Sequence, residues 1–244
     1  MGSSSPDDDV WVWHASVHEA WRDPARLATA LEWLTPPEHG RYLRYRHDRD
    51  RHMFLLGRVM ARATVGRALG VSPTSWRWRE GGRGRPEIDA PDVRLSFNLA
   101  HSADVVVCAL SHGREVGVDV EDRIRPPVDE AIVERFCAPA EVSDIVAQGP
   151  DGWRGRFLTY WTLKEAYLKA RGLGIAVHLS HVCFRLGPPH VTIEFQDTLA
   201  GTDANWAFEL GDIGGQHVIA VAAPIVNGHR PRFTIAPFPL DLLP

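Results

Sequence analysis

The charged residues of one apolar stretch are spaced so that their side chains can act together. In WTLKEAYLKARGLG, from Trp161 to Gly174, residues Trp161, Glu165 and Lys169 recur every four positions, which is the spacing of one helix face. The other positions are mostly apolar, as in a buried helix. Burying Lys164, Glu165 and Lys169 costs on the order of several kcal/mol unless partners or ligands satisfy them. We therefore expect a ligand or an ion at this helix.

A second pair of acids lies on a predicted strand in the first half of the chain. In VGVDVED, which begins at Val116, the alternation of a strand puts Gly117, Asp119 and Glu121 on one face. The two carboxylates would stand about 7 Å apart. Unpaired like charges at this separation repel, so a cation between them is the natural resolution. The preceding VVVCAL and the turn SHGRE predict that this strand closes a hairpin.

Asp119, Glu121 and Glu165 together offer an all-oxygen metal site, which suits Mg²⁺, with Mn²⁺ as a possible substitute, better than zinc. An ordinary interpretation stays open, in which these are surface acids and Glu165 forms an i,i+4 salt bridge with Lys169, worth roughly a few tenths of a kcal/mol. The alternative is a metal ligand beside a cation that neutralises phosphate. Burial of the helix favours this alternative.

Two further patterns concern anions. His101 and Ser102 are neighbours on a predicted strand, so their side chains point to opposite faces and cannot form a nucleophile and its base. His101 is then either an anion contact or a hydrogen-bonded structural residue. Arg51, Arg58 and Arg62 form a basic stripe on a predicted helix. The stripe is either a solvated face or the lining of an anion site.

The composition restricts the class of protein. The 244 residues carry a formal net charge of −4 and suffice for one large domain or two of about 120 residues. The chain has no run of 18 apolar residues, and its polar start lacks the apolar part of a signal peptide. We therefore expect a cytoplasmic protein with no membrane partner. Its three cysteines form no CxxC pair, and the acidic net charge argues against binding to nucleic acid.

The remaining patterns predict the elements that would position these residues. Helices are expected at 25–34, 53–69, 128–137 and 139–148, and strands from Val10 and at 95–102, 105–110, 181–186, 190–195, 205–210 and 217–224. Helices precede strands in both halves, and HVIAVAAP echoes VVVCALS, a hint of internal duplication. The break at Arg125-Pro126-Pro127 divides the chain into 1–122 and 123–244. The Pro-rich tail carries no clear core signal.

Four motifs follow one another in a defined order. They are GRP at Gly84–Pro86, FNLAHS at Phe97–Ser102, GVDVE at Gly117–Glu121 and WTLKEAYLK at Trp161–Lys169. In this combination the chain resembles the 4'-phosphopantetheinyl transferases of the larger, surfactin-synthetase-activating type, over about residues 35 to 225. The last two motifs are the specific ones, whereas GRP alone is weak.

The resemblance implies an α+β fold of two similar α/β subdomains with pseudo-twofold symmetry, acting as a monomer with coenzyme A in the cleft between them. Residues 1–122 would form the nucleotide side with the GVDVE strand, and 123–244 would supply the WTLKEAYLK helix. The implied enzyme is a magnesium-dependent holo-[acyl-carrier-protein] synthase. It transfers 4'-phosphopantetheine from coenzyme A to a serine hydroxyl of an apo acyl or peptidyl carrier protein and releases adenosine 3',5'-bisphosphate. Such carriers serve polyketide, nonribosomal peptide or fatty acid biosynthesis.

The family's functional residues carry over onto the matching motif positions. The metal ligands would be Asp119, Glu121 and Glu165. The cations at the phosphates of coenzyme A would be Arg41, Arg85, His101 and Lys169. Arg41, in a less securely aligned stretch, would reach the 3'-phosphate.

Two positions depart from the family pattern. Ala100 stands where serine is frequent, which removes a hydroxyl near the nucleotide. Glu38 occupies a position that is sometimes basic, so the 3'-phosphate would depend more on Arg41 and Arg44. Neither departure touches the proposed metal ligands.

The serine also needs a base. Glu165, directly or through a metal-bound water, is the first choice, and Glu141 is the alternative. Three rival functions are a non-catalytic binding module with the same fold, a nucleic-acid binder and a magnesium-dependent hydrolase of coenzyme A. A non-catalytic module would be expected to lose a carboxylate or the lysine, and this chain retains them. A hydrolase could use the same ligands.

Overall fold

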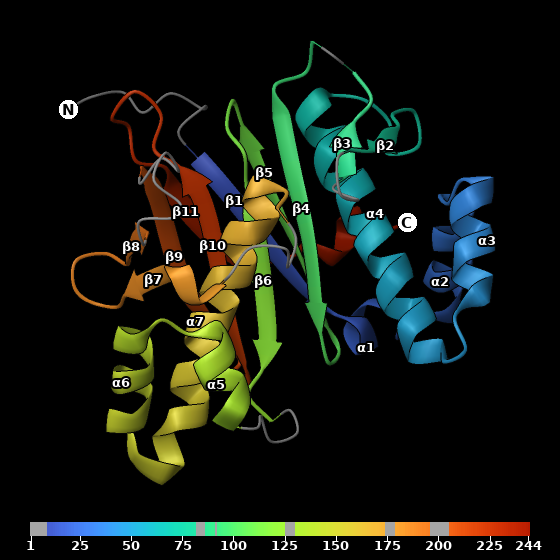
Figure 1. Ribbon diagram of the computed structural model, residues 1–244. Helices are drawn as coiled ribbons and strands as arrows, with labels where there is room; N and C mark the ends of the chain where they lie inside the picture. Colours follow the sequence, from blue (N-terminus) through green and yellow to red (C-terminus); the bar gives the residue numbers. More distant parts are fainter. Residues whose placement is uncertain (1–8, 82–85, 91, 125–129, 174–178, 196–204) are drawn as a thin grey trace.

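Two long helices, each lying on a sheet, organise the chain (Figure 1). They are α4 (Asp48–Leu69) and α7 (Gly149–Arg171). Each ends at a glycine in the left-handed conformation, Gly70 with φ 67° and Gly172 with φ 60°, which glycine adopts without steric cost. The predicted stop at Gly70 is confirmed. α7 begins earlier than the apolar stretch that revealed it.

This computed structural model describes residues 9–81, 86–90, 92–124, 130–173, 179–195 and 205–244. Arg85 and the break at 125–127 lie outside the described residues. Within the ranges just given, no helix is both long and apolar enough to cross a membrane.

The first half surrounds α4 with short helices and most strands of one sheet. Its other elements are β1 (Asp9–Ser16), α1 (Val17–Ala20), α2 (Pro24–Glu32), α3 (Pro36–Arg44), β2 (Trp78–Glu80), β3 (Pro86–Ile88), β4 (Leu95–Ser102) and β5 (Val105–His112). The second half follows the same order of one strand, then helices, then further strands. Its other elements are β6 (Gly117–Asp122), α5 (Glu130–Phe136), α6 (Pro139–Ala147), a 3₁₀ turn (Leu179–His181), β7 (Val182–Arg185), β8 (Thr192–Phe195), β9 (Trp206–Ile213), β10 (His217–Pro224), β11 (Arg232–Pro237) and a last 3₁₀ turn (Leu240–Leu242).

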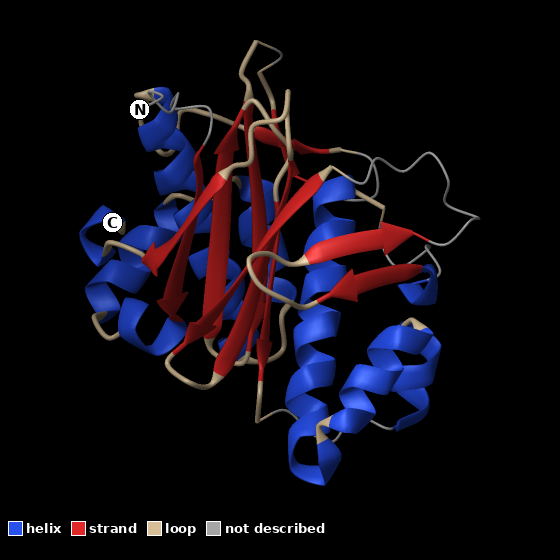
Figure 2. Ribbon diagram, turned by 90° about the vertical axis from the view of Figure 1, so that its left-hand side faces the viewer, coloured by secondary structure: helices blue, strands red, loops and turns tan. Residues whose placement is uncertain are grey.

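The main strands form two sheets, with helices on both sides of the strand layer (Figure 2). One sheet has the order β11-β1-β5-β4 and the other β6-β10-β9. All neighbours are antiparallel except β11, which runs parallel to β1. Two small hairpins, β2–β3 and β7–β8, lie beside them. The central strands β5 and β10 are the segments whose sequences echo each other.

The predicted hairpin between 105–110 and the GVDVED strand is wrong. β5 already has β1 and β4 on its two edges, so β6 pairs with β10 in the other sheet. Side chains of β4 then join the two sheets: Asn98 Oδ1 accepts the N–H of Val118 at 3.1 Å, and the Ser102 hydroxyl accepts the N–H of Asp122 at 3.1 Å.

Strand pairing also divides the chain differently from the predicted boundary at residue 122. β6 belongs with the strands of the second half, while β11, near the end of the chain, completes the sheet of the first half. The tail, for which no core signal was found, is partly buried as well. Phe238 and Leu243 are 4 % and 6 % exposed and pack in the cluster around α4.

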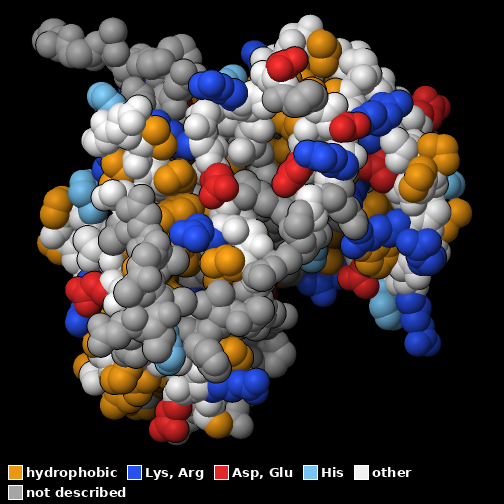
Figure 3. Space-filling model, turned by 45° about the horizontal axis from the view of Figure 1, so that its top comes forward, with side chains coloured by type: hydrophobic (Ala, Val, Ile, Leu, Met, Phe, Trp, Pro, Cys, Tyr) orange, Lys and Arg blue, Asp and Glu red, His pale blue; other side chains and the backbone are white. Residues whose placement is uncertain are grey.

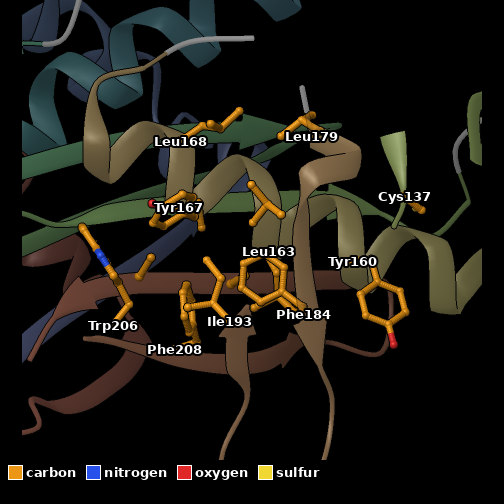
Figure 4. Packing of buried hydrophobic residues seen from close by; sticks show 14 of the residues in the cluster. Cys137, Tyr160, Leu163, Tyr167, Leu168, Leu179, Phe184, Ile193, Trp206 and Phe208 are labelled. Carbon is orange, nitrogen blue, oxygen red and sulfur yellow. The ribbon is translucent and has the colours of Figure 1, made fainter. Parts of the chain in front are cut away.

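Buried residues fill both sides of the sheets. Val116, Val118 and Val120 lie in a cluster shared by the two sheets, which confirms their predicted alternation with Asp119 and Glu121. Beneath α7, Leu163 and Tyr167 point toward residues of the second sheet and the β7–β8 hairpin (Figure 4). The predicted α+β class with two subdomains is confirmed, and each subdomain places a long helix against a sheet.

Candidate active site

The close approach of β6 to α7 builds the site. α7 packs against β6 and β10, and a Cβ on Gly117 would collide with the backbone of Ala166 and Ala170. Only glycine lets the strand lie this near the helix. Asp119 and Glu121 follow on the same face and are 6 % and 8 % exposed. The glycine therefore sets the short distance between these acids and the helix.

The helix face predicted from the four-residue spacing turns toward these acids. Lys169 Nζ lies 2.7 Å from Asp119 Oδ1, and the indole N–H of Trp161 donates to Glu121 Oε1 at 3.0 Å. Lys169 thus forms its ion pair with an acid on the strand, in place of the i,i+4 bridge to Glu165. The spacing identified the face correctly, whereas the partner of the lysine depends on the fold.

Burial makes two acids of this cluster, Asp119 and Glu165, harder to ionise. Burial, which outweighs the opposing charge and hydrogen bond of Lys169, raises the pKa of Asp119 to about 7, and the negative charges of Glu121 and Glu165 add to the rise. Burial likewise raises the pKa of Glu165, and Lys169 opposes that shift. Both carboxylates would hold their protons less firmly beside another positive charge.

The donor set fits a divalent cation in its chemistry. Among the described residues, Asp119 Oδ2 and Glu165 Oε1 are buried and have no hydrogen-bond partner, and oxygens of this kind are what Mg²⁺ binds. The acids are not gathered into a finished site, however. As the described side chains stand, no three of the Asp, Glu, His and Cys type are grouped to hold an ion.

Two residues that sequence reasoning left without a role hold Glu121. Besides the indole of Trp161, the Ser102 hydroxyl donates to Glu121 Oε2 at 3.4 Å. Two features of the sequence could have identified these residues. Trp161 lies on the same helix face as Glu165, and Ser102 points to the opposite side of its strand from His101. The structure confirms these orientations, since Ser102 is buried and His101 is exposed.

A cavity on the first-half side of the cluster contains two of the predicted phosphate contacts. Its volume is about 280 Å³, and its lining includes Arg41, Tyr45, Phe54 and His101. Partial burial of the imidazole, and then the positive charge of Lys169, lowers the pKa of His101. Its neighbour on β4, Ser102, donates to Glu121, so this end of the cavity lies beside the acidic cluster. Arg85, another of the predicted contacts, lies outside the described residues.

Glu141, predicted as the alternative base, does not lie in this acidic cluster, and the predicted site is corrected accordingly. Its carboxylate is fully buried, 2.8 Å from Lys164 Nζ, and accepts the N–H groups of Ala138 and Phe184 at 2.7 and 2.8 Å. Lys164 also donates to backbone carbonyls, among them that of Leu179 at 2.9 Å. These contacts give both residues a structural role and leave Glu141 no oxygen facing a substrate.

The basic stripe on α4 is not a solvated face. Arg62 is 1 % exposed, and its Nη2 lies 2.7 Å from Glu38 Oε2. The same carboxylate oxygen accepts from the backbone N–H and the hydroxyl of Thr35 at the start of α3. Glu38, an acid at a position that is sometimes basic in the family pattern, therefore forms an ion pair with the buried Arg62.

The comparisons with known proteins agree with these motifs. A family model described as the 4'-phosphopantetheinyl transferase superfamily matches residues 115–222, and one described as 4'-phosphopantetheinyl transferase, N-terminal, matches 19–113. The phosphopantetheinyl transferase of Thraustochytrium sp. is 34 % identical over 217 residues, covering 84 % of this chain and 73 % of that protein.

Two bacterial relatives are similar over a shorter length. The 4'-phosphopantetheinyl transferase HetI of Nostoc sp. is 34 % identical over 69 % of this chain and 71 % of its own length. The 4'-phosphopantetheinyl transferase Sfp of Bacillus subtilis is 30 % identical over 69 % of this chain and 74 % of its own length. Together with the motifs on β4, β6 and α7, these matches show that the chain belongs to the 4'-phosphopantetheinyl transferases, enzymes that transfer 4'-phosphopantetheine from coenzyme A to carrier proteins.

Proposed function

We propose that Asp119, Glu121 and Glu165 hold Mg²⁺, or Mn²⁺ in its place, at the pyrophosphate of coenzyme A. The observation that carries this proposal is the pair of buried carboxylate oxygens without partners, Asp119 Oδ2 and Glu165 Oε1. Trp161 and Ser102 hold Glu121 in place from both of its oxygens. When bound, the metal supplies positive charge against the phosphate oxygens.

The acceptor is a serine hydroxyl of an acyl or peptidyl carrier protein. Glu165 accepts the hydroxyl proton as the serine oxygen forms a bond to the β-phosphorus. The bond from that phosphorus to the bridging oxygen breaks, and adenosine 3',5'-bisphosphate leaves.

The basic residues bind and orient the nucleotide. Lys169, whose side chain is 30 % exposed, neutralises charge that develops on the phosphate oxygens. His101 and Arg85 contact the phosphates, and Arg41 contacts the 3'-phosphate. His101 and Arg41 share one cavity, which supports their common assignment.

The test is the transfer itself, measured together with metal binding. The protein is incubated with Mg²⁺, coenzyme A and an apo carrier protein, and the carrier is weighed by mass spectrometry. Asp119→Asn and Glu165→Gln should each lower the rate at least roughly hundredfold, and Mn²⁺ binding followed by electron paramagnetic resonance should weaken in both. Asp241→Asn, which changes an exposed acid in the last 3₁₀ turn, is the matched control.

Each outcome has a distinct meaning. Transfer at near wild-type rate by either variant would contradict the metal assignment. Cleavage of coenzyme A without a gain of mass on the carrier would indicate a hydrolase. A serine-to-alanine carrier that still gains the group would contradict the proposed acceptor.

We also propose that the protein is cytoplasmic and acts as a monomer, as the family resemblance supports. Light scattering would test the monomeric state. The two functional halves are proposed to divide between β5 and β6, since β6 pairs with β10. Residues before that point bind the nucleotide, and those after it supply the acids and Lys169.

A further inference from the structure

A larger cavity beside the first carries a strong excess of positive charge. Its volume is about 620 Å³, and its charged lining residues are Arg41, Arg44, Arg58, Arg62, Arg77 and Glu38. Lys and Arg side chains gather on the same side of the molecule in Figure 3, where the helices of the first half lie. One carboxylate cannot balance five guanidinium groups, so the cavity suits a ligand with more than one negative charge.

Two of these arginines already have strong partners inside the protein. Arg62 is paired with Glu38 at 2.7 Å. Arg77 Nη1 donates to the backbone carbonyls of Thr74 and Trp76 at 2.6 and 3.0 Å. Both side chains are therefore held by contacts within the protein.

Arg58 is different, because its charge is enclosed without an equivalent partner. Its Nε is 3.7 Å from Glu38 Oε1, too far for a hydrogen bond, and no described residue accepts from this buried nitrogen. The guanidinium carbon lies over the rings of Phe54 and Trp78, 4.8 and 4.9 Å from their centroids. Burial lowers the pKa of Arg58, and although Glu38 opposes this, the positive charge of Arg41 adds to it.

The two aromatic rings stabilise the cation but do not use its hydrogen bonds. Cation–π contact holds a guanidinium over a ring, whereas its N–H groups donate in its own plane, in a fork that matches a phosphate. A buried donor that lacks an acceptor is unfavourable until a ligand supplies one. Phe54 and Trp78 thus keep Arg58 ready for an anion.

The position of Arg58 identifies which anion of coenzyme A it can meet. Arg58 and Arg41 line both cavities, while His101, whose neighbour Ser102 donates to Glu121, lines the smaller one. The guanidinium groups of Arg41 and Arg58 therefore connect the cavity beside the acidic cluster with the larger one. Coenzyme A carries two separate anionic groups, the pyrophosphate and the 3'-phosphate on the ribose.

We propose that Arg58 determines specificity for the 3'-phosphate of coenzyme A, by donating from its guanidinium to that phosphate where its side chain lines both cavities. This rests on the proposed function, in which the first half binds the nucleotide and the pyrophosphate lies at Lys169. Arg58 touches the substrate far from the bond that breaks, so its contribution is to binding and selection.

The test compares coenzyme A with 3'-dephospho-coenzyme A in the transfer assay. For the wild type, kcat/KM should be higher with coenzyme A. Arg58→Gln should lower that preference roughly tenfold to hundredfold, as expected for a charge-assisted hydrogen bond, with kcat for dephospho-coenzyme A little changed. Arg58→Lys keeps the charge and loses the planar fork. Its preference for coenzyme A should lie between those of the wild type and Arg58→Gln.

A control, Arg67, and a comparison, Arg44, which the resemblance places near the 3'-phosphate, use other arginines of the same region. Arg67→Gln alters an exposed residue of α4 and should keep the wild-type preference. Arg44→Gln alters a residue that lines the larger cavity alone, and it should reduce the preference less than Arg58→Gln. A preference that survives Arg58→Gln, or that is lost in Arg44→Gln instead, would overturn the proposal.

A binding measurement separates this proposal from the chemistry. Calorimetric titration with adenosine 3',5'-bisphosphate and with adenosine 5'-monophosphate, in a chelating buffer, requires neither metal nor carrier. Arg58→Gln should reduce the difference between these nucleotides by roughly tenfold to hundredfold, leaving the share of Arg41, in a protein whose circular dichroism is unchanged. If the difference is undiminished, the assignment of Arg58 fails even where transfer is confirmed, whereas a failure of transfer in the wild type leaves this measurement valid.

Discussion

Glu141→Gln removes the negative charge from an ion pair that the protein encloses completely. Glu141 and Lys164 are both fully buried, with Oε2 and Nζ 2.8 Å apart. The same carboxylate accepts the backbone N–H groups of Ala138 and Phe184. The amide of glutamine keeps an oxygen for one of these N–H groups, but it leaves the ammonium of Lys164 without a counter-charge.

The expected loss of stability is large. Removing one partner of a buried ion pair costs about 3–5 kcal/mol, out of a total stability of about 5–15 kcal/mol. In a chain of this size 1 kcal/mol lowers Tm by roughly 2–4 °C, so Tm should fall by roughly 6–20 °C. Lys164→Met should be milder, because the remaining carboxyl can take up a proton. Burial already raises the pKa of Glu141.

The assay combines thermal unfolding by circular dichroism with the transfer rate at a temperature well below the lower Tm. Glu141→Gln should keep kcat within a few-fold of the wild type while it is folded. Glu165→Gln should behave in the opposite way, with a loss of rate and little loss of stability. The double variant Glu141→Gln/Lys164→Met should recover much of the lost stability, because no unpaired charge remains.

An unchanged Tm in Glu141→Gln, together with a rate about 10²–10⁴-fold lower, would refute the structural role and return this acid to the list of bases. A double variant less stable than both single variants would refute the argument from the unpaired ammonium.

Three further outcomes follow from the site. Gly117→Ala should destabilise the protein by about 1–3 kcal/mol or more in chemical unfolding, because its Cβ meets the backbone of Ala166; wild-type stability would contradict the close approach. Trp161→Phe removes the N–H at Glu121, and the concentration of Mg²⁺ for half-maximal rate should rise roughly tenfold with an unchanged KM for coenzyme A. Because the pKa of Asp119 rises from about 3.9 when unfolded to about 7 when folded, the folded state binds more protons between these values. In a chelating buffer the free energy of unfolding should therefore fall as pH rises from about 4 to about 7, and an equally steep fall in Asp119→Asn would contradict this cause.

The sequence predicted the local elements and the reactive face well, because both depend on short-range periodicity. The four-residue spacing of Trp161, Glu165 and Lys169 needs only a helix, and the alternation around Asp119 needs only a strand. Gly117 was predicted to share the face of Asp119 and Glu121, and the backbone of α7 lies directly against it. These features follow from residues within one element.

What the sequence could not predict depends on contacts between distant elements. The hairpin prediction failed because the edges of β5 are taken by β1 and β4, which no local pattern reveals. The partner of Lys169 required the position of β6 against α7. The sequence pattern allows Arg62 to be a surface residue, because its ion pair with Glu38 depends on how another helix, α3, packs against α4.

The arrangement of β6 and β11 has a consequence for how the enzyme selects a substrate by its length. The main chain passes from the first sheet to the second before β6 and returns to the first at β11, while Asn98 and Ser102 bond the sheets between those points. A single linker would permit two lobes to open and close about a hinge, but these crossings tie the lobes together. His101 on one sheet and Asp119 on the other are therefore connected by more than one hinge. If they lie at the phosphates as proposed, selection of coenzyme A by the length between its phosphates needs no closing movement and little loss of conformational entropy.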